Sequence, residues 1–434
     1  MKLLVFAHTP PPHHGQSYMV QLMVEGFGGD RRKARRGGRS NSGEGRPTDG
    51  SFGIECYHVN ARLSKKLEDI GDLRIGKFFL LLGYCLQAIW CRFRYGVTTF
   101  YYIPAPGKRS ALYRDWVVMV ICRLFFKRII LHWHAAGLAK WLEMVVGMRF
   151  RSITYNLMRR VDLSIVLSRF NRADAEKIFS RHIKVVSNGI PDPCARFGRD
   201  VLPRRKGRHA ARAKLMAGES VEGEGLKDTG GDPQVVKILY LAHCTREKGL
   251  FDTLSAAALL NERLTNSRSP LSVRLLVAGG FVTAEEEADF KRIMGQPGMA
   301  SMVHYFGFVS GEQKSLLLRD ADLFCFPTYF QNENQPVNLI EAMAFGLPIL
   351  TTRWRSLPEL FPADYRGLVS VRSPEQVADG LLWLMASESG EGFREIFLSN
   401  FTLERHLTGL AEAFLQGETP GPTAVPVGAL GTGQ

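Results

Sequence analysis

The sequence lacks the patterns that would place this chain in an oxidising compartment or give it a zinc site. It has only seven cysteines in 434 residues, and they are scattered without a Cys-x-x-Cys pair. An odd number of unevenly spaced cysteines argues against a disulfide framework and favours reduced thiols in a cytoplasmic setting. We therefore expect neither disulfides nor a zinc site.

Long hydrophobic runs are also missing. The longest apolar stretch, 78–91, contains Gly83 and Gln87 and is too short to span a bilayer. The first residues, 1–8, carry one lysine and a short apolar run, which predicts a strand and not a signal peptide. We expect a cytoplasmic protein without a transmembrane helix, and a peripheral position on the inner face of the membrane stays open.

Acidic residues are fewer than basic ones. The chain has 42 Asp and Glu against 56 Lys and Arg, a net charge of +14, and a pI of about 9.5. Such a surplus predicts anionic partners: nucleotide phosphates, lipid head groups or nucleic acid.

Two stretches, 28–52 and 195–233, are rich in Gly and Arg and poor in apolar residues, so we expect solvated or disordered insertions. Neither interleaves aromatic residues for base stacking, so we expect no nucleic-acid partner.

The length predicts two domains, because 434 residues exceed one ordinary core. Strand and helix patterns alternate in both halves, which predicts an α/β fold of two doubly wound parallel sheets with helices on both faces. Strands are expected at 2–8, 54–60, 99–103, 128–134, 163–167 and 184–187, then at 235–242, 272–278, 302–306, 323–326 and 349–352. The expected domains are 1–194 and 234–415, joined by a flexible linker at 195–233 and followed by a disordered tail at 416–434. The last helix, 403–415, could pack back on the first domain.

The most informative stretch follows the short apolar strand at 323–326. A polar loop there holds Glu333, and Pro336 suits the first turn of the next helix, where its missing N–H costs nothing. That helix carries Glu341 and should stop at Gly346, with Pro348 just beyond. One carboxylate thus lies at a strand's carboxyl end and one about two turns later, where ligands bind in open α/β sheets.

Two further motifs follow strands of the first domain. Gly15, near a helix start, lets backbone N–H groups approach an anion, although a plain tight turn explains it equally well. Alternation places His132 and His134 on one strand face, with His134 nearer the cleft. A metal pair would need further ligands, so a hydrogen-bonding or general acid/base histidine is favoured over it, and a structural histidine remains the alternative.

A loop in the second domain carries cations. Arg246 and Lys248 follow His243 and precede a helix that starts at Gly249. Cations beside a helix N-terminus suit a diphosphate, although charged loop residues are often merely solvated.

Together these pieces resemble the retaining, nucleotide-sugar-dependent GT-B glycosyltransferases of family 4. The resemblance spans 2–415 and follows the family's order of motifs. They are the Pro-Pro-x-x-Gly loop ending at Gly15, the histidine strand, the Val-x-Asn-Gly-Ile turn at 186–190, the Glu-Lys-Gly loop at 247–249, and Glu333-x7-Glu341 followed by Ala-Met-Ala-x-Gly-Leu-Pro. The version Asn-Glu-Asn-Gln-Pro at 332–336 looks like a subset associated with bacterial surface polysaccharide assembly. The resemblance implies a GT-B fold, with two Rossmann-like domains facing a cleft.

The resemblance also implies roles for single residues. Glu333 would bind hydroxyls of the donor sugar and Glu341 those of the ribose, while His134 would face the transferred sugar. Lys248 would neutralise the leaving diphosphate. The family usually has an arginine where His243 stands, and Arg246 is the candidate replacement. The remaining implied contacts are Gly15 and Gln16 with the diphosphate or acceptor, and the backbone amides of Val337, Asn338 and Leu339 with the phosphates.

The activity implied is that of a retaining hexosyltransferase-type glycosyltransferase. It would move a sugar from a nucleotide sugar to a saccharide or lipid-linked acceptor in cell-surface polysaccharide assembly. No cofactor and no metal are expected, because Lys248 and the helix dipole can stabilise the leaving diphosphate. A GT-B-fold nucleotide-sugar epimerase is the alternative, and it would need several acid/base residues at the cleft.

The acceptor side carries a further expectation. Segments 78–94 and 116–128 mix aromatic, aliphatic and basic residues, which is typical of contact with an anionic membrane surface. Helices that merely cover a sheet are the alternative.

Overall fold

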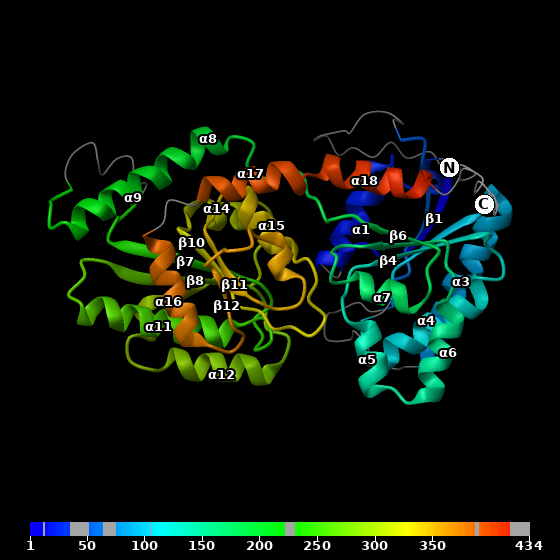
Figure 1. The fold of residues 1–434 in the computed structure, drawn as a ribbon, viewed down its shortest axis with the longest axis horizontal. Coiled ribbons are helices and arrows are strands. Elements are labelled where there is room, and N and C mark those ends of the chain that lie inside the picture. Colours follow the sequence, from blue (N-terminus) through cyan, green and yellow to red (C-terminus); the bar gives the residue numbers. More distant parts are fainter. Residues whose placement is uncertain are drawn as a thin grey trace, which may run out of the picture.

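Two α/β domains lie side by side in the computed structural model (Figure 1). The structure describes residues 1–11, 14–34, 52–63, 75–104, 106–221, 231–386 and 390–416. Most of the predicted insertion at 28–52 and nearly all of the predicted tail at 416–434 lie outside these described residues. Each domain is built on a six-stranded parallel sheet, which confirms the predicted doubly wound architecture.

The N-terminal sheet has the strand order β2-β1-β3-β4-β5-β6. Its strands are β1 (Lys2–Phe6), β2 (Glu55–Val59), β3 (Thr99–Tyr102), β4 (Arg128–Trp133), β5 (Leu163–Val166) and β6 (His182–Val185). Its helices are α1 (Gly15–Gly26), α2 (Arg31–Ala34), α3 (Ile75–Tyr95), α4 (Arg109–Cys122), α5 (Leu138–Val145), α6 (Met148–Met158) and α7 (Arg172–Lys177). Alternate strand residues enter separate cores on the two faces, with Leu4 and Phe6 on the α3–α4 side and Leu3 and Val5 on the α1 side.

The C-terminal sheet has the strand order β12-β11-β10-β7-β8-β9. Its strands are β7 (Val235–Leu241), β8 (Ser272–Ala278), β9 (Val303–Tyr305), β10 (Leu323–Phe326), β11 (Ile349–Thr352) and β12 (Leu368–Val369). Its helices are α11 (Leu250–Asn266), α12 (Ala284–Met294), α13 (Met299–Met302), α14 (Gly311–Asp320), α15 (Val337–Ala344), α16 (Pro374–Met385) and α17 (Gly390–Asn400), with a 3-10 turn at Leu357–Leu360. The central strands β7 and β10 are almost entirely apolar, as buried parallel strands are.

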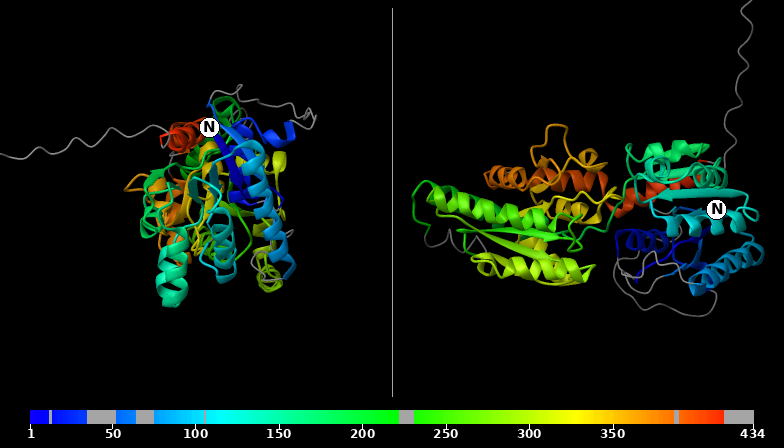
Figure 2. Two further views of the ribbon diagram at one scale, coloured as in Figure 1. Left: turned by 90° about the vertical axis from the view of Figure 1, so that its right-hand side faces the viewer. Right: turned by 90° about the horizontal axis from the view of Figure 1, so that it is seen from below.

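The chain crosses between the domains twice, and the crossings lie side by side. Ile190 on the first crossing bridges Thr402 on the second. The last helix, α18 (Leu403–Leu415), then packs on the N-terminal domain, where Leu410 and Phe414 join the core that holds Leu3. Figures 1 and 2 show this helix, in red, lying along the N-terminal domain.

The expectation of a flexible linker at 195–233 is wrong over most of its described part. Residues 197–216 form α8 (Phe197–Asp200) and α9 (Leu202–Met216), which lie on the outer side of the C-terminal domain (Figure 1). Two arginines of α9 are not solvated, because Arg208 and Arg212 both form ion pairs with the buried Asp322. A charge-rich sequence was read as disordered because its buried partner lies more than a hundred residues away.

Candidate active site

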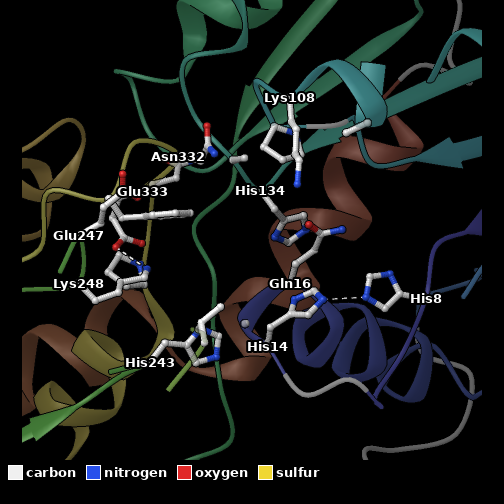
Figure 3. A pocket seen from close by; sticks show the side chains of 18 of the residues that line it. His8, His14, Gln16, Lys108, His134, His243, Glu247, Lys248, Asn332 and Glu333 are labelled. Carbon is white, nitrogen blue, oxygen red and sulfur yellow. Dashed lines mark hydrogen bonds and ion pairs between the residues drawn. The ribbon is translucent and has the colours of Figure 1, made fainter. Parts of the chain in front are cut away.

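A cavity of about 980 Å³ lies between the two domains. The loops that line it follow β1 and β4 in one domain and β7 and β10 in the other. Both sheets therefore direct their carboxyl ends at the same space, which is where open α/β sheets bind ligands. Figure 3 shows the two walls, with His134 and Gln16 on one side and Lys248 and Glu333 on the other.

Most of the predicted site residues meet at this cavity. The N-terminal domain contributes Gly15, Gln16 and His134, and the C-terminal domain contributes His243, Lys248, Glu333, Val337 and Asn338. They come from four separate stretches of the chain. The fold therefore brings together what the motifs only suggested, although the individual roles stay predictions.

An ion pair joins the two most informative motifs. Lys248 Nζ lies 2.8 Å from Glu333 Oε2, and Thr328 Oγ1 donates to the same oxygen at 2.9 Å. Gly249 places Lys248 there, because it adopts a φ of 82° and an added Cβ would collide with the Pro327 carbonyl. The lysine also lies 4.4 Å from the ring centroid of Phe330. A cation and a carboxylate are thus held, mostly buried, against the cavity.

The N-terminus of α15 opens onto the same wall. Pro336 is its N-cap residue, and Val337 and Asn338 line the cavity. The side chain of Asn338 donates to the carbonyl of Leu241 at 2.8 Å and so ties the helix start to the end of β7. Gly15 approaches from the other domain, since a Cβ there would lie 3.6 Å from Val337 Cγ2. The first amides of α15 can serve an anion in this gap.

Three expected residues do not line the cavity. Arg246 forms an ion pair with Asp289 on α12 and stacks over Phe251, outside the cavity lining, so its expected role in place of the arginine at His243 stays a prediction. Leu339 is fully buried, and its backbone N–H donates to the Pro336 carbonyl at 3.2 Å. Glu341 forms an ion pair with Lys314 on α14 and would have to exchange this lysine for a ribose.

His134 is held neutral. Burial, with smaller contributions from His406 and His14, lowers its pKa to about 3. Its ring lies 4.2 Å from that of His132, centroid to centroid, and His132 hydrogen-bonds the Tyr101 hydroxyl at 2.7 Å. At neutral pH His134 therefore offers an uncharged hydrogen-bonding group to the cavity.

A histidine pair at the end of β1 was missed. The Nε2 atoms of His8 and His14 lie 2.8 Å apart (Figure 3). His14 Nδ1 accepts the Ser17 N–H at the start of α1, so its proton lies on Nε2 and is donated to His8. Burial is the main reason that the pKa of His8 falls to about 4. The capping pattern of His14 and Ser17 was the available signal in the sequence, but the approach of His8 depends on where the end of β1 lies beside α1.

The N-terminal wall is both basic and apolar. Arg62, Lys77, Lys108 and Arg114 line it, and so do apolar side chains, among them Leu63, Phe78, Leu81 and Val117. None of the four cations was expected at the site. They are scattered over three segments, and only the fold brings them to one surface.

The described residues contain no group of three or more His, Cys, Asp or Glu side chains placed to hold a metal. All seven cysteines are buried as free thiols. Within the described part of the chain, no helix is both long and apolar enough to cross a membrane.

Comparison with known proteins finds glycosyltransferases that are similar to parts of this chain. Residues 227–397 match the family described as "Glycosyl transferases group 1". The putative colanic acid biosynthesis glycosyltransferase WcaL of Escherichia coli is 30% identical over 158 residues, which is 36% of either chain. The amylovoran biosynthesis glycosyltransferase AmsK of Erwinia amylovora is 26% identical over 153 residues, 34% of this chain and 35% of that protein. This chain thus matches about a third of the length of these curated relatives.

Solved structures are similar over nearly the whole chain. Anabaena HepE in complex with UDP and glucose superimposes with a TM-score of 0.59 at 14% identity, covering 96% of this chain and 100% of that one. Sucrose-phosphate synthase from Thermosynechococcus elongatus gives a TM-score of 0.63 at 17% identity, covering 96% and 99%. At such identities the likeness shows the fold alone. The chain is therefore similar over its C-terminal domain to group 1 glycosyl transferases, and over its described length it has the GT-B fold of two facing Rossmann-like domains.

Proposed function

We propose that this protein is a retaining hexosyltransferase-type glycosyltransferase that moves a sugar from a nucleotide sugar to a lipid-linked or saccharide acceptor in surface polysaccharide assembly. The observation that carries the proposal is the C-terminal wall, where the mostly buried Lys248–Glu333 pair and the N-terminus of α15 face one cavity. The named relatives in colanic acid and amylovoran biosynthesis support the polysaccharide context.

The chemistry follows from where charge develops. Breaking a glycosyl–phosphate bond makes the sugar ring positive and the departing diphosphate negative. Lys248 and the first amides of α15 are fixed donors on the departing side, so they stabilise that negative charge without reorganising. Glu333 lies beside Lys248 and suits hydrogen bonds to hydroxyls of the donor sugar.

The opposite wall suits the positive ring. His134 is uncharged, so it can donate or accept a hydrogen bond without repelling the developing cation. Glu341 is paired with Lys314 outside the cavity lining. Glu333 and Glu341 therefore do not form the facing carboxylate pair that glycosidases use. Cationic groups at the site carry the charge stabilisation for which other enzymes use a metal, so we propose no metal.

The acceptor side favours a lipid-linked acceptor at the inner face of the membrane. Lys77, Phe78 and Leu81 of α3 line the cavity, and the same helix exposes Phe79, Leu86, Trp90 and Phe93. An apolar surface thus continues from the cavity to the outside of the protein. The cations Arg62, Lys108 and Arg114 lie where this surface enters the cavity and suit a phosphate-linked head group.

The test is transfer of a radiolabelled sugar. The HepE structures contain UDP and glucose or UDP-glucose, so UDP-sugars are the first donors, with a bacterial lipid extract as acceptor. We expect label in the lipid fraction together with nucleoside diphosphate release. Epimerised nucleotide sugar formed without acceptor would favour the epimerase instead, and an unchanged donor in every combination would contradict both.

Variants connect this assay to the site. Lys248→Ala should lower kcat by about 10²- to 10³-fold, the usual loss for one transition-state donor. His134→Ala should lower turnover while donor binding persists. The controls are Lys291→Ala on α12, where the lysine forms only an exposed pair with Glu287, and His304→Ala on β9. If both site variants kept full activity, the site assignment would be wrong.

A further inference from the structure

The loop that carries Glu333 contacts the other domain through the side chain of the next residue, Asn334. Asn334, only 2% exposed, donates through Nδ2 to Asn171 Oδ1 at 2.7 Å and to the Trp133 carbonyl at 3.3 Å. Its Oδ1 accepts from Ser168 Oγ at 3.1 Å and from Ser356 Oγ at 3.0 Å. Three of these four partners belong to the N-terminal domain, and Trp133 immediately precedes His134.

Asn171 is in turn hydrogen-bonded to Asp174. Asn171 Nδ2 donates to Asp174 Oδ2 at 2.8 Å, and the same carboxylate accepts the N–H groups of Gly137 and Ala139, each at 2.7 Å. These two amides belong to the turn that follows His134 and starts α5. A chain of hydrogen bonds thus runs from the residue after Glu333 to the backbone just beyond His134.

The direction of each amide in this chain is determined. An ionised Asp174 can only accept, so the amino group of Asn171 must face it and the Asn171 oxygen must face Asn334. Asn334 must therefore present its amino group across the interface. A carboxylate at position 334 would put two acceptors face to face, although its shape is the same.

Other contacts hold the same two loops together. Gln335 accepts the Asn188 N–H at 2.5 Å, and the Asn188 side chain donates to the Gln335 carbonyl at 3.0 Å. Gly137, at a φ of 91°, leaves room for the Arg355 guanidinium, with which an added Cβ would collide. Both residues between Glu333 and Pro336 are thus bonded across the interface, beside the cavity and not at a distance from it.

We propose that Asn334 is a positioning residue, which sets the donor-side loop of Glu333 against the His134 turn through Asn171 and Asp174. The proposal rests on the proposed function, because the relative position of the two loops matters only if both walls act in the same sugar transfer. Withdrawing one loop from the other would leave buried amide groups without partners, so a single relative position is favoured. Misplacing reacting groups by about 1 Å can cost 10²-fold in rate, so the effect should appear in turnover.

The test compares Asn334→Asp and Asn334→Ala with the parent protein. Both variants should lower kcat for sugar transfer at least tenfold, while the Kd for UDP, measured by calorimetry, changes less than threefold. Asn171→Ala should have a similar effect, and the double variant Asn334→Ala/Asn171→Ala should be little worse than either single one. Arg172→Ala is the control, because this exposed arginine of α7 pairs only with Glu176 on its own helix.

A second measurement does not depend on activity. Amide hydrogen exchange of the peptide that holds Gly137 and Ala139 should be faster in Asn334→Asp than in the parent protein or in Arg172→Ala. Full kcat in Asn334→Asp, or unchanged exchange at this peptide, would overturn the proposal. A parent protein that transfers no sugar would refute the proposed function alone, and the exchange result would still decide whether Asn334 positions the turn.

Discussion

At the residue scale, burial holds the histidines around the cavity in their neutral form. It lowers the pKa of His134 to about 3, and those of His8 and His406 to about 4. His406, on α18, donates from Nδ1 to the Ser187 carbonyl at 2.6 Å, on the first crossing between the domains. These rings contribute to stability only while they remain unprotonated.

We therefore predict that the protein loses stability between pH 6.5 and about pH 4, where these histidines would take up protons on unfolding. For a group whose pKa falls from 6.5 in the unfolded chain to about 4, the unfolded state binds more protons between these values. The contribution of the neutral ring to the free energy of unfolding is complete above pH 6.5. It is lost as pH falls toward 4, by up to about 1.4 kcal/mol per pH unit. Carboxylates such as Asp322, whose pKa is lowered by Arg212 and Arg208 against the effect of burial, act below this window.

His406→Gln tests this expectation. Its Tm should fall less between pH 6.5 and pH 4.5 than that of the parent protein, although the variant starts from a lower value because the buried site is disturbed. His304→Gln changes an exposed histidine of β9 and is the control. An equally steep loss of Tm in His406→Gln would show that this ring does not carry the effect.

Motif residues were predictable at this scale, and their partners were not. Lys248 and Glu333 were each singled out from local patterns, and both line the cavity. Their 2.8 Å ion pair was not predicted, because 85 residues separate them. Glu341 was singled out by the same motif, yet its ion pair with Lys314 depends on how α14 packs beside α15.

At the element scale, buried strands were predicted well. Strands β8, β10 and β11 begin and end at the predicted residues, because a short apolar run between turn residues leaves little choice of where a strand starts and stops. The two-residue strand β12 and the helix α17 were missed. Helix α9 was predicted as linker, because its side chains include few apolar residues and its arginines find a partner in the distant Asp322.

Asp322 should therefore be essential for docking α9. It lies 2.7 Å from both Arg208 Nε and Arg212 Nη2 and accepts the Lys237 N–H at 2.9 Å. Asp322→Ala would leave buried cations without a partner, and we expect a loss of about 3–5 kcal/mol in the free energy of unfolding, measured in urea. Asp320→Ala removes the more exposed partner of Lys237 and should cost less than about 1 kcal/mol. Equal losses would contradict the buried network.

At the scale of the whole molecule, apolar and basic groups gather on the outer helices of the N-terminal domain. Phe79, Trp90 and Phe93 of α3 are exposed, and so is Leu124 just after α4. Arg92 and Arg94 lie in the last turn of α3. The inner face of α3 covers the sheet, since Leu81 and Cys85 are buried in the core. The exposed side chains lie on its outer face, so covering the sheet does not explain them.

We predict binding to anionic vesicles through this surface. In flotation at low salt the parent protein should bind phosphatidylglycerol vesicles, and Phe79→Ser/Trp90→Ser should bind at least fivefold more weakly. Binding should weaken as salt rises, because the basic side chains attract the lipid charge. Leu382→Ser removes an exposed leucine from α16 of the other domain and should have no effect. Absence of binding at low salt would refute the membrane proposal.

The sequence by itself determined the fold class and the pieces of the donor wall. Both follow from short-range physics: apolar periodicity sets parallel strands, and a glycine or proline sets each helix start beside a charged loop. Only the tertiary structure decided which partner each polar side chain has. It pairs the arginines of α9 with Asp322 and Glu341 with Lys314, and it brings His8 against His14. It alone placed Asn334 against Asn171, because a hydrogen bond between residues 163 positions apart depends on how two whole domains meet.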